Sequence, residues 1–357
     1  MEGVIYDSKI EYLQVMDADG NVDQALFPKD LKDEDILEMY RKMMLARAID
    51  AKVLSLQRQG RAVTYAPLLG EEATQIGSAS AMRSNDIFVP SFRQHGVFAA
   101  RGMPLETMFI YWRGFEEGNI IPKGVNATPT IVPVATQLPH AAGMAFAQKY
   151  KNTGAYVIVY VGDGGTSEGD FYEGLNFAGA FGLPMVVIIE NNQWAISMPR
   201  RKQTAAATLA QKADAAGIAA MQVDGNDVIA VYKATREAIN SGKPFVIECI
   251  TYRMGLHTTS DDPGKYREDA EVKEWERRDP LARVSKYLTG KTILNPEIEK
   301  KIREDQAREI DSAVEKAEKF VPDPRSMYTN VYGSMPRVLE EELDEAERNG
   351  FWSGDLK

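Results

Sequence analysis

The 357-residue chain has a single cysteine, and it has no apolar run near the ~20 residues that a membrane-spanning helix requires. One cysteine excludes a disulfide framework within the chain. That residue, Cys249, lies in the apolar run PFVIECI, which is typical of an unreactive strand position. The N-terminus, MEGVIYDSKIEY, lacks the basic and then apolar pattern of a secretory signal. We therefore expect a cytoplasmic protein with no membrane partner.

The chain has fewer basic than acidic residues. The chain carries 42 lysines and arginines against 52 aspartates and glutamates, which gives a formal net charge of −10. Nucleic acid is therefore disfavoured as the main partner, because phosphate backbones require a concentrated basic face. The short basic cluster at 199–202 is typical of a solvated loop. With 44% hydrophobic and 26% charged residues, the composition is that of an ordinary globular protein.

The most informative segment of the chain lies between residues 156 and 192. An apolar run at 156–161 (YVIVYV) leads into the turn GDGG at 162–165, and a second run at 185–189 (MVVII) leads into Asn191-Asn192. A helix-length segment separates the two runs, which predicts a strand, a helix and a parallel strand. Adjacent parallel strands lie about 5 Å apart, so Asp163 and Asn192 at their carboxyl ends can converge on one small cation.

A carboxylate and an amide oxygen beside a glycine-rich turn suit magnesium, which prefers oxygen ligands and is often shared with substrate phosphates. The glycines at 162, 164 and 165 leave room for phosphates near the backbone, and the following helix offers its positive end. The turn lacks the lysine of a P-loop, which disfavours a nucleotide-dependent magnesium enzyme. An ordinary asparagine turn, or a non-catalytic scaffold whose motif has decayed, would also be compatible with this pattern.

Apolar periodicity predicts an α/β fold. Helices are expected at 33–59, 70–83, 104–113, 136–150, 206–216 and 227–241, and strands at 156–161, 185–190, 220–223 and 244–252. Strands that alternate with helices predict a mainly parallel sheet with helices on both faces. Residues 10–30 are expected to form a small hairpin or an edge extension. We divide the chain into an N-terminal arm (1–32), the α/β domain (33–290) and a helical C-terminal extension (291–357).

The spacing GDG-X26-NN is the thiamin-diphosphate signature, and the chain resembles the α subunit of the decarboxylating component of 2-oxo acid dehydrogenase complexes. The resemblance extends over roughly residues 30–290. Other stretches that carry it are RQGR at 58–61, YAP at 65–67, GEEA at 70–73, ATQLP at 135–139 and YRMGLH at 252–257 with SDDP at 260–263. It implies the thiamin-diphosphate-binding fold, with thiamin diphosphate and Mg²⁺ as cofactors.

Carried onto matching positions, the resemblance implies a set of site residues. Asp163, Asn192 and the main-chain carbonyl of Trp194 would bind the metal. His257 would be the catalytic residue, in proton transfer or in stabilising a lipoyl thiolate. Residues that would contact the cofactor are Phe92, Arg93, Val132, Val134, Gly162, Gly164, Gly165, Ile196 and His257. Ile196 would be the apolar wedge that bends it, and Asp170 and Glu173 would line a tunnel between two active sites.

Ordinary structural roles are also open to several of these residues. Ile196 could equally be a core residue, because an apolar residue after a turn is unremarkable. Arg93 could lie on the surface, but forked guanidinium donors favour phosphate binding. Asp170 and Glu173 lie three apart on a predicted helix and could form a solvated face. His257 lies in the polar loop 254–270, where an imidazole that exchanges protons near neutral pH favours function.

The resemblance implies oxidative decarboxylation of a 2-oxo acid, with transfer of the product to a lipoyl group on the acyltransferase component. The glutamate that activates the cofactor belongs to a separate β subunit in this family, so we expect an α2β2 heterotetramer. Motifs of pyruvate and branched-chain enzymes are mixed, and the α subunit of an acetoin dehydrogenase is an alternative.

Two positions near His257 bear on the resemblance. Leu256 stands where the family often has a histidine, just before His257. Thr258 matches a position that is phosphorylated in mitochondrial relatives, where a phosphate would repel the diphosphate.

Overall fold

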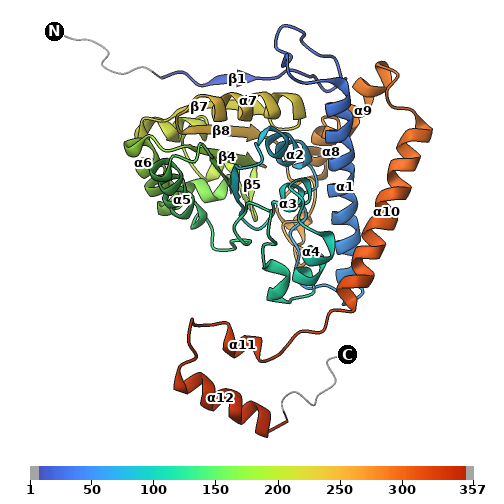
Figure 1. Cartoon of the computed structure of the whole chain (residues 1–357). Coiled ribbons are helices and arrows are strands. Elements are labelled where there is room, and N and C mark those ends of the chain that lie inside the picture. Colours follow the sequence, from blue (N-terminus) through green and yellow to red (C-terminus); the bar gives the residue numbers. More distant parts are fainter. Residues whose placement is uncertain (1–7, 351–357) are drawn as a thin grey trace, which may run out of the picture.

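The computed structural model describes residues 8–350, and its centre is a six-stranded sheet in the order β1-β7-β8-β4-β3-β2 (Figure 1). Every neighbouring pair in this sheet runs parallel. Its strands are β1 (Glu11–Leu13), β2 (Ile87–Val89), β3 (Val157–Gly162), β4 (Met185–Asn191), β7 (Ala219–Asp224) and β8 (Phe245–Ile250). A separate antiparallel pair is formed by β5 (Trp194–Ala195) and β6 (Met198–Pro199). The predicted parallel α/β class is confirmed.

Helices connect the strands and continue beyond the last one. They are α1 (Asp33–Arg58), α2 (Glu72–Ala81), α3 (His95–Ala100), α4 (Leu105–Trp112), α5 (Gln137–Lys151), α6 (Gly169–Phe181), α7 (Val228–Asn240), α8 (Asp269–Glu276), α9 (Pro280–Gly290), α10 (Pro296–Glu318), α11 (Ser326–Thr329) and α12 (Arg337–Arg348). Shorter 3-10 turns are η1 (Glu116–Asn119), η2 (Gly164–Ser167), η3 (Arg200–Lys202), η4 (Ala210–Ala216) and η5 (Pro263–Lys265).

Polar caps fix where several helices begin. The carboxylate of Asp227 accepts hydrogen bonds from the amides of Ile229 and Ala230 at the start of α7. Helices α9 and α10 begin with an acceptor followed by proline, Asp279-Pro280 and Asn295-Pro296. Proline at the first helical position loses no helical hydrogen bond, because that amide has no partner within the helix.

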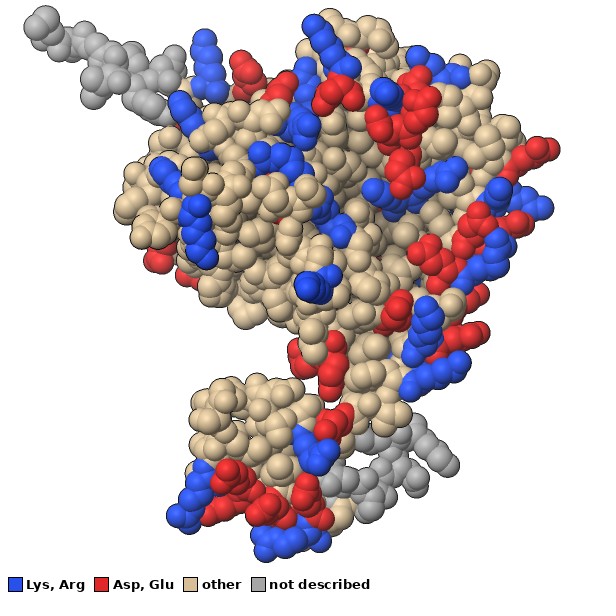
Figure 2. All heavy atoms as spheres, viewed as in Figure 1, with Lys and Arg blue, Asp and Glu red and all other residues tan. Residues whose placement is uncertain are grey.

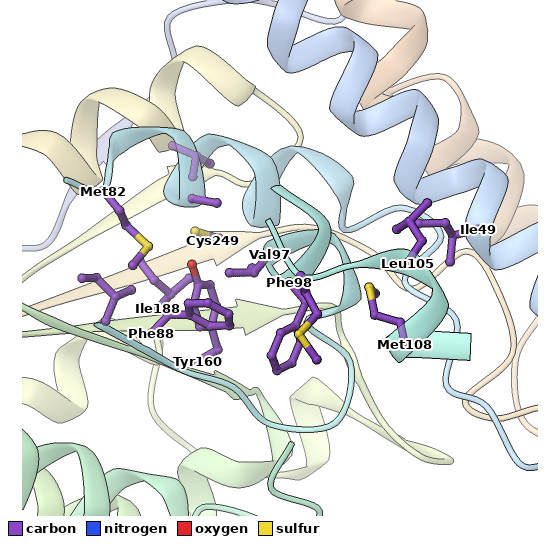
Figure 3. Close-up of a cluster of buried hydrophobic side chains, with 14 of the residues drawn as sticks. Ile49, Met82, Phe88, Val97, Phe98, Leu105, Met108, Tyr160, Ile188 and Cys249 are labelled. Carbon is purple, nitrogen blue, oxygen red and sulfur yellow. The ribbon is translucent and has the colours of Figure 1, made fainter. Parts of the chain in front are cut away.

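Alternate residues of the central strands pack into different cores, which is why the strands are apolar throughout. Val157, Val159 and Val161 of β3 pack beneath α5 and α6, whereas Ile158 and Tyr160 face the opposite side. On that side, side chains of β2, β3 and β4 meet Val97 and Phe98 of α3 and further residues of α1, α4 and α7 (Figure 3). Helices on both faces therefore bury the central strands β3 and β4, whereas the edge strand β1 stays exposed.

The N-terminal segment extends the sheet and packs against the domain. β1 adds to the edge beside β7, and Met16 forms an antiparallel bridge with Val22. The carboxylate of Asp227 also accepts hydrogen bonds from the amides of Val15 and Met16 at 2.7 and 2.6 Å. This is the predicted edge extension with a short hairpin.

At the other end of the chain, α10 lies alongside α1, while α11 and α12 lie apart from the body (Figure 1). Charges of both signs crowd the edge formed by α10 (Figure 2). Within residues 8–350, every helix is too short or too polar to span a bilayer. The division into arm, domain and extension stays a prediction, and residues 1–7 and 351–357 of it lie outside the described part.

The structure differs locally from what the sequence predicts. The helix expected at 206–216 is the 3-10 segment η4, which ends at Gly217 with φ +65°. Only seven residues lie between Leu209 and Gly217, and short connecting segments frequently adopt the 3-10 form. The sequence did not predict strand β2, because its three residues are too few to show the alternation of apolar and polar residues that indicates a strand.

A buried carboxyl group lies between α1 and the loop before α2. Asp50 is almost fully buried, and its carboxylate accepts hydrogen bonds from the Tyr65 hydroxyl and from the Leu68 amide, the latter at 2.8 Å. Burial raises the pKa of Asp50 to about 8, against the opposing effect of the Tyr65 hydrogen bond. The folded chain therefore holds a proton there that the unfolded chain releases near pH 4.

Stability should consequently fall as pH rises from about 4 to about 8, by at most ~1.4 kcal/mol per pH unit from this group. Asp50→Asn keeps both hydrogen bonds, with the new amide donating to Tyr65, but it removes the ionisation. The variant should gain stability relative to wild type as pH rises through that window. Urea unfolding at several pH values measures this, and parallel stability curves for the two proteins would contradict it.

Candidate active site at the carboxyl ends of the parallel strands

The register of β3 and β4 brings the two predicted metal ligands to one edge of the sheet. Gly162 pairs with Glu190, so Asp163 and Asn192 follow the ends of two paired strands. Both side chains are buried. They face a cavity of about 470 Å³ beyond the strand ends.

All the residues predicted for the cofactor and the metal line this one cavity. They are Phe92, Arg93, Val132, Val134, Gly162, Asp163, Gly164, Gly165, Asn192, Trp194, Ile196 and His257. Thr258 also lines it, whereas Asp170 and Glu173 lie on α6 outside it. The structure thus brings together segments that lie far apart in the sequence, while their chemical roles stay predictions.

The environment of Asp163 suits a bound cation. Its buried carboxylate accepts a hydrogen bond from the side-chain amide of Gln203 at 2.6 Å. Burial raises the pKa of Asp163 to about 6. A divalent ion would offset this unfavourable burial of charge.

Asn192 and Trp194 supply neutral oxygens beside this carboxylate. Asn192 Oδ1 accepts from the Trp194 amide at 3.3 Å, and the Trp194 carbonyl accepts from Arg253 Nη1 at 3.1 Å. Within the described chain, no cluster of three or more histidine, cysteine, aspartate or glutamate side chains could hold a metal. One carboxylate with neutral oxygens fits magnesium, which keeps waters and substrate phosphates among its ligands.

Two glycines of the turn after β3 are required by packing. A Cβ atom at Gly164 would lie 2.6 Å from Ala195 Cβ, and one at Gly165 would lie 2.6 Å from Val161 Cγ2. The neighbouring Gly162, in contrast, has open space around it. The turn continues as η2, so the predicted helix after the glycines, α6, begins at Gly169.

Ile196 is held in a strained conformation at the cavity wall. Its φ is +53°, which is rare for a β-branched residue. Its side chain is 58% exposed, and Val132 and Val134 are 56% and 50% exposed. Ile196 is therefore no core residue in this chain, and such strain is often found at functional sites.

Two arginines surround the imidazole of His257. Arg93 Nη2 and Arg253 Nη1 lie 3.2 and 3.1 Å from His257 Nδ1. Because guanidinium groups only donate, Nδ1 accepts and the ring proton is assigned to Nε2. Burial, followed by the charges of Arg93 and Arg253, lowers the pKa of His257 to about 4.

Sequence reasoning missed several residues of the site. Glu71 and Glu190 line the cavity, and each has one buried carboxylate oxygen without a hydrogen-bond partner in the described chain. Burial raises the pKa of Glu71 to about 7, and burial with the neighbouring Glu71 raises the pKa of Glu190 well above its usual range. Glu71 and Arg253 belong to the stretches GEEA and YRMGLH that carry the family resemblance, and that was the signal for them. No signal pointed to Gln203.

The fold defines an α/β protein with a large cavity at the carboxyl ends of its parallel strands. The family model "Dehydrogenase E1 component" matches residues 40–324. Relatives named "Pyruvate dehydrogenase E1 component subunit alpha" include one from Staphylococcus epidermidis, 43% identical over 343 residues (94% of this chain and 93% of the relative). One from Acholeplasma laidlawii is 43% identical over 334 residues (92% and 96%). The chain belongs to the dehydrogenase E1 component family, and the predicted resemblance is confirmed.

The histidine pKa can be checked directly, because the chain contains only His95, His140 and His257. In protein without cofactor, His257 should stay neutral until the pH falls to about 4, since both arginines oppose its protonation. Nitrogen-detected NMR titration measures this, with His257→Gln assigning the signal. A midpoint near the ordinary value of about 6.5 would contradict the described contacts.

Proposed function

We propose that the chain is the α subunit of a pyruvate dehydrogenase E1 component that binds thiamin diphosphate through Mg²⁺. The convergence of Asp163 and Asn192 in a cavity that also contains Arg93 carries this proposal. Relatives at 42–43% identity along nearly the whole chain bear the name of a pyruvate enzyme, which favours pyruvate as substrate. They favour it over branched-chain 2-oxo acids and over acetoin.

The residues of the cavity divide between anchoring and orienting the cofactor. Asp163, Asn192 and the Trp194 carbonyl would hold Mg²⁺, while Arg93 and the backbone of Gly164 and Gly165 would contact the diphosphate. The apolar wall of Val132, Val134 and Ile196 offers contact surface for the aromatic rings. When bound, thiamin diphosphate supplies the carbanion chemistry that removes carbon dioxide from a 2-oxo acid.

His257 is the candidate for proton transfer in the same cavity. Its Nδ1 is occupied by two guanidinium donors, so Nε2 carries the exchangeable proton. From Nε2 it would donate a hydrogen bond to a substrate carboxylate or to a lipoyl thiolate of the acyltransferase component. An anion in the cavity would raise the low pKa of His257 and favour this donation.

Exposed aromatic side chains on α5 and α6 support a second subunit. Phe146, Phe177 and Phe181 contact one another, with ring centroids 4.7–5.9 Å apart, although each is 38–49% exposed. Contiguous exposed apolar side chains of this kind are common at protein interfaces. α5 follows closely after the exposed Val132 and Val134 of the cavity, so a β subunit seated here could also complete the cofactor site.

Removing the anchoring carboxylate tests the cofactor assignment. Asp163→Ala should abolish Mg²⁺-dependent binding of thiamin diphosphate, because the remaining neutral oxygens bind a hard cation weakly. Isothermal calorimetry with and without Mg²⁺ measures it, with ATP as the competing ligand. Equal binding by the variant, or preference of the wild type for ATP, would refute the assignment.

The substrate and the partner are tested together. The chain co-expressed with its β subunit should decarboxylate pyruvate faster than 3-methyl-2-oxobutanoate, and it should leave acetoin unreacted. The chain alone should be inactive, because the glutamate that activates the cofactor lies on the β subunit in this family. Full activity of the isolated chain, or a preference for either other substrate, would overturn the corresponding part of the proposal.

A further inference from the structure

Two consecutive asparagines at the end of β4 are held by two different buried glutamates. Asn191 Nδ2 donates to Glu248 Oε1 at 2.7 Å, and Asn192 Nδ2 donates to Glu71 Oε1 at 2.9 Å. Both glutamates are fully buried. Only the pair Asn192–Glu71 lines the cavity.

The contact with Glu71 determines which way the Asn192 amide faces. An asparagine amide carries one acceptor oxygen and one donor nitrogen, and a carboxylate oxygen that accepts a hydrogen bond selects the nitrogen. Asn192 Oδ1 is thereby turned away from Glu71 and lies 3.3 Å from the Trp194 amide. A flipped amide would instead set two oxygens against each other and offer no oxygen to a metal.

Glu71 also contacts the arginine of the cavity. Arg93 Nε lies 3.7 Å from the same Oε1 atom that accepts from Asn192. Glu71 Oε2 is buried and has no hydrogen-bond partner in the described chain. One carboxylate oxygen thus links a candidate phosphate ligand to a candidate metal ligand.

We propose that Glu71 is a positioning residue that fixes Asn192 Oδ1 toward the metal and sets Arg93 beside it. The inference rests on the proposed function, since it concerns how Mg²⁺ and thiamin diphosphate are bound. Groups that orient metal ligands typically contribute 10- to 100-fold to metal affinity.

Two substitutions of Glu71 distinguish its role in orienting the Asn192 amide from the effect of its negative charge. In Glu71→Gln, the side-chain oxygen can keep both Oε1 contacts, and the new amide nitrogen takes the position of the unpartnered Oε2. Metal affinity should therefore stay within about threefold of wild type. Glu71→Leu has a similar volume but no acceptor, so Asn192 loses its orientation and Mg²⁺ affinity should fall roughly 10- to 100-fold.

Glu248 provides the matched control. Glu248→Leu removes the same kind of buried acceptor from the neighbouring Asn191, whose side chain does not line the cavity. It also removes hydrogen bonds from the Ala210 amide and Gln222. We expect a lower melting temperature, with Mg²⁺-dependent binding within about threefold of wild type.

The experiment is calorimetric titration of thiamin diphosphate at several Mg²⁺ concentrations into the chain co-purified with its β subunit. Weak binding by Glu71→Leu, with near-normal binding by Glu71→Gln and Glu248→Leu, is the expected result. Normal binding by Glu71→Leu, or equal loss in Glu71→Gln, would overturn the inference. If wild type shows no Mg²⁺-dependent binding, the proposed function itself fails, which is a distinguishable outcome.

A second variant keeps the test decisive if Glu71→Leu does not fold. Glu71→Asp retains a carboxyl group but is one methylene shorter, so without a backbone shift it cannot keep the 2.9 Å contact with Asn192. Mg²⁺ affinity should therefore fall roughly 10-fold although the acidic group is retained. Unchanged Mg²⁺ affinity of Glu71→Asp would contradict the positioning role.

Discussion

The structure depends on the parallel pairing of β3 and β4. This pairing puts the ends of both strands at one edge of the sheet, so Asp163 and Asn192 approach each other although 28 residues separate them in the chain. A slip of one residue would turn each side chain to the opposite face. The register is held because both faces of each strand are buried, and the apolar residues of β3 would lose their packing on slipping.

The site gathers several buried ionisable side chains around one cavity. Asp163, Glu71 and Glu190 are buried acids with raised pKa values, and Arg93 and Arg253 are buried with them. Such groups oppose folding unless they are paired. A diphosphate and a divalent cation would pair with both signs at once, so ligand binding should stabilise the fold as well as supply chemistry.

Much of this arrangement could be predicted from the sequence because it is local. Apolar runs located the central strands within about two residues, and the turn sequences indicated the side chains that line the cavity at the strand ends. The predicted core helices at 33–59, 70–83, 104–113, 136–150 and 227–241 correspond to α1, α2, α4, α5 and α7. The contacts of Glu71 and Arg253 could not be predicted, because they depend on how distant loops pack. The positive φ of Ile196 could not be predicted either, because a positive φ is expected mainly at glycine and this residue is isoleucine.

The most direct test locates the metal itself. Mn²⁺ accepts the same oxygen ligands as Mg²⁺ and scatters X-rays anomalously. A crystal of the assembled enzyme grown with Mn²⁺ and thiamin diphosphate should show one strong anomalous peak between Asp163 and Asn192, at bonding distance from both side-chain oxygens. A peak elsewhere, with the cofactor bound and these two oxygens free of metal, would contradict the central claim.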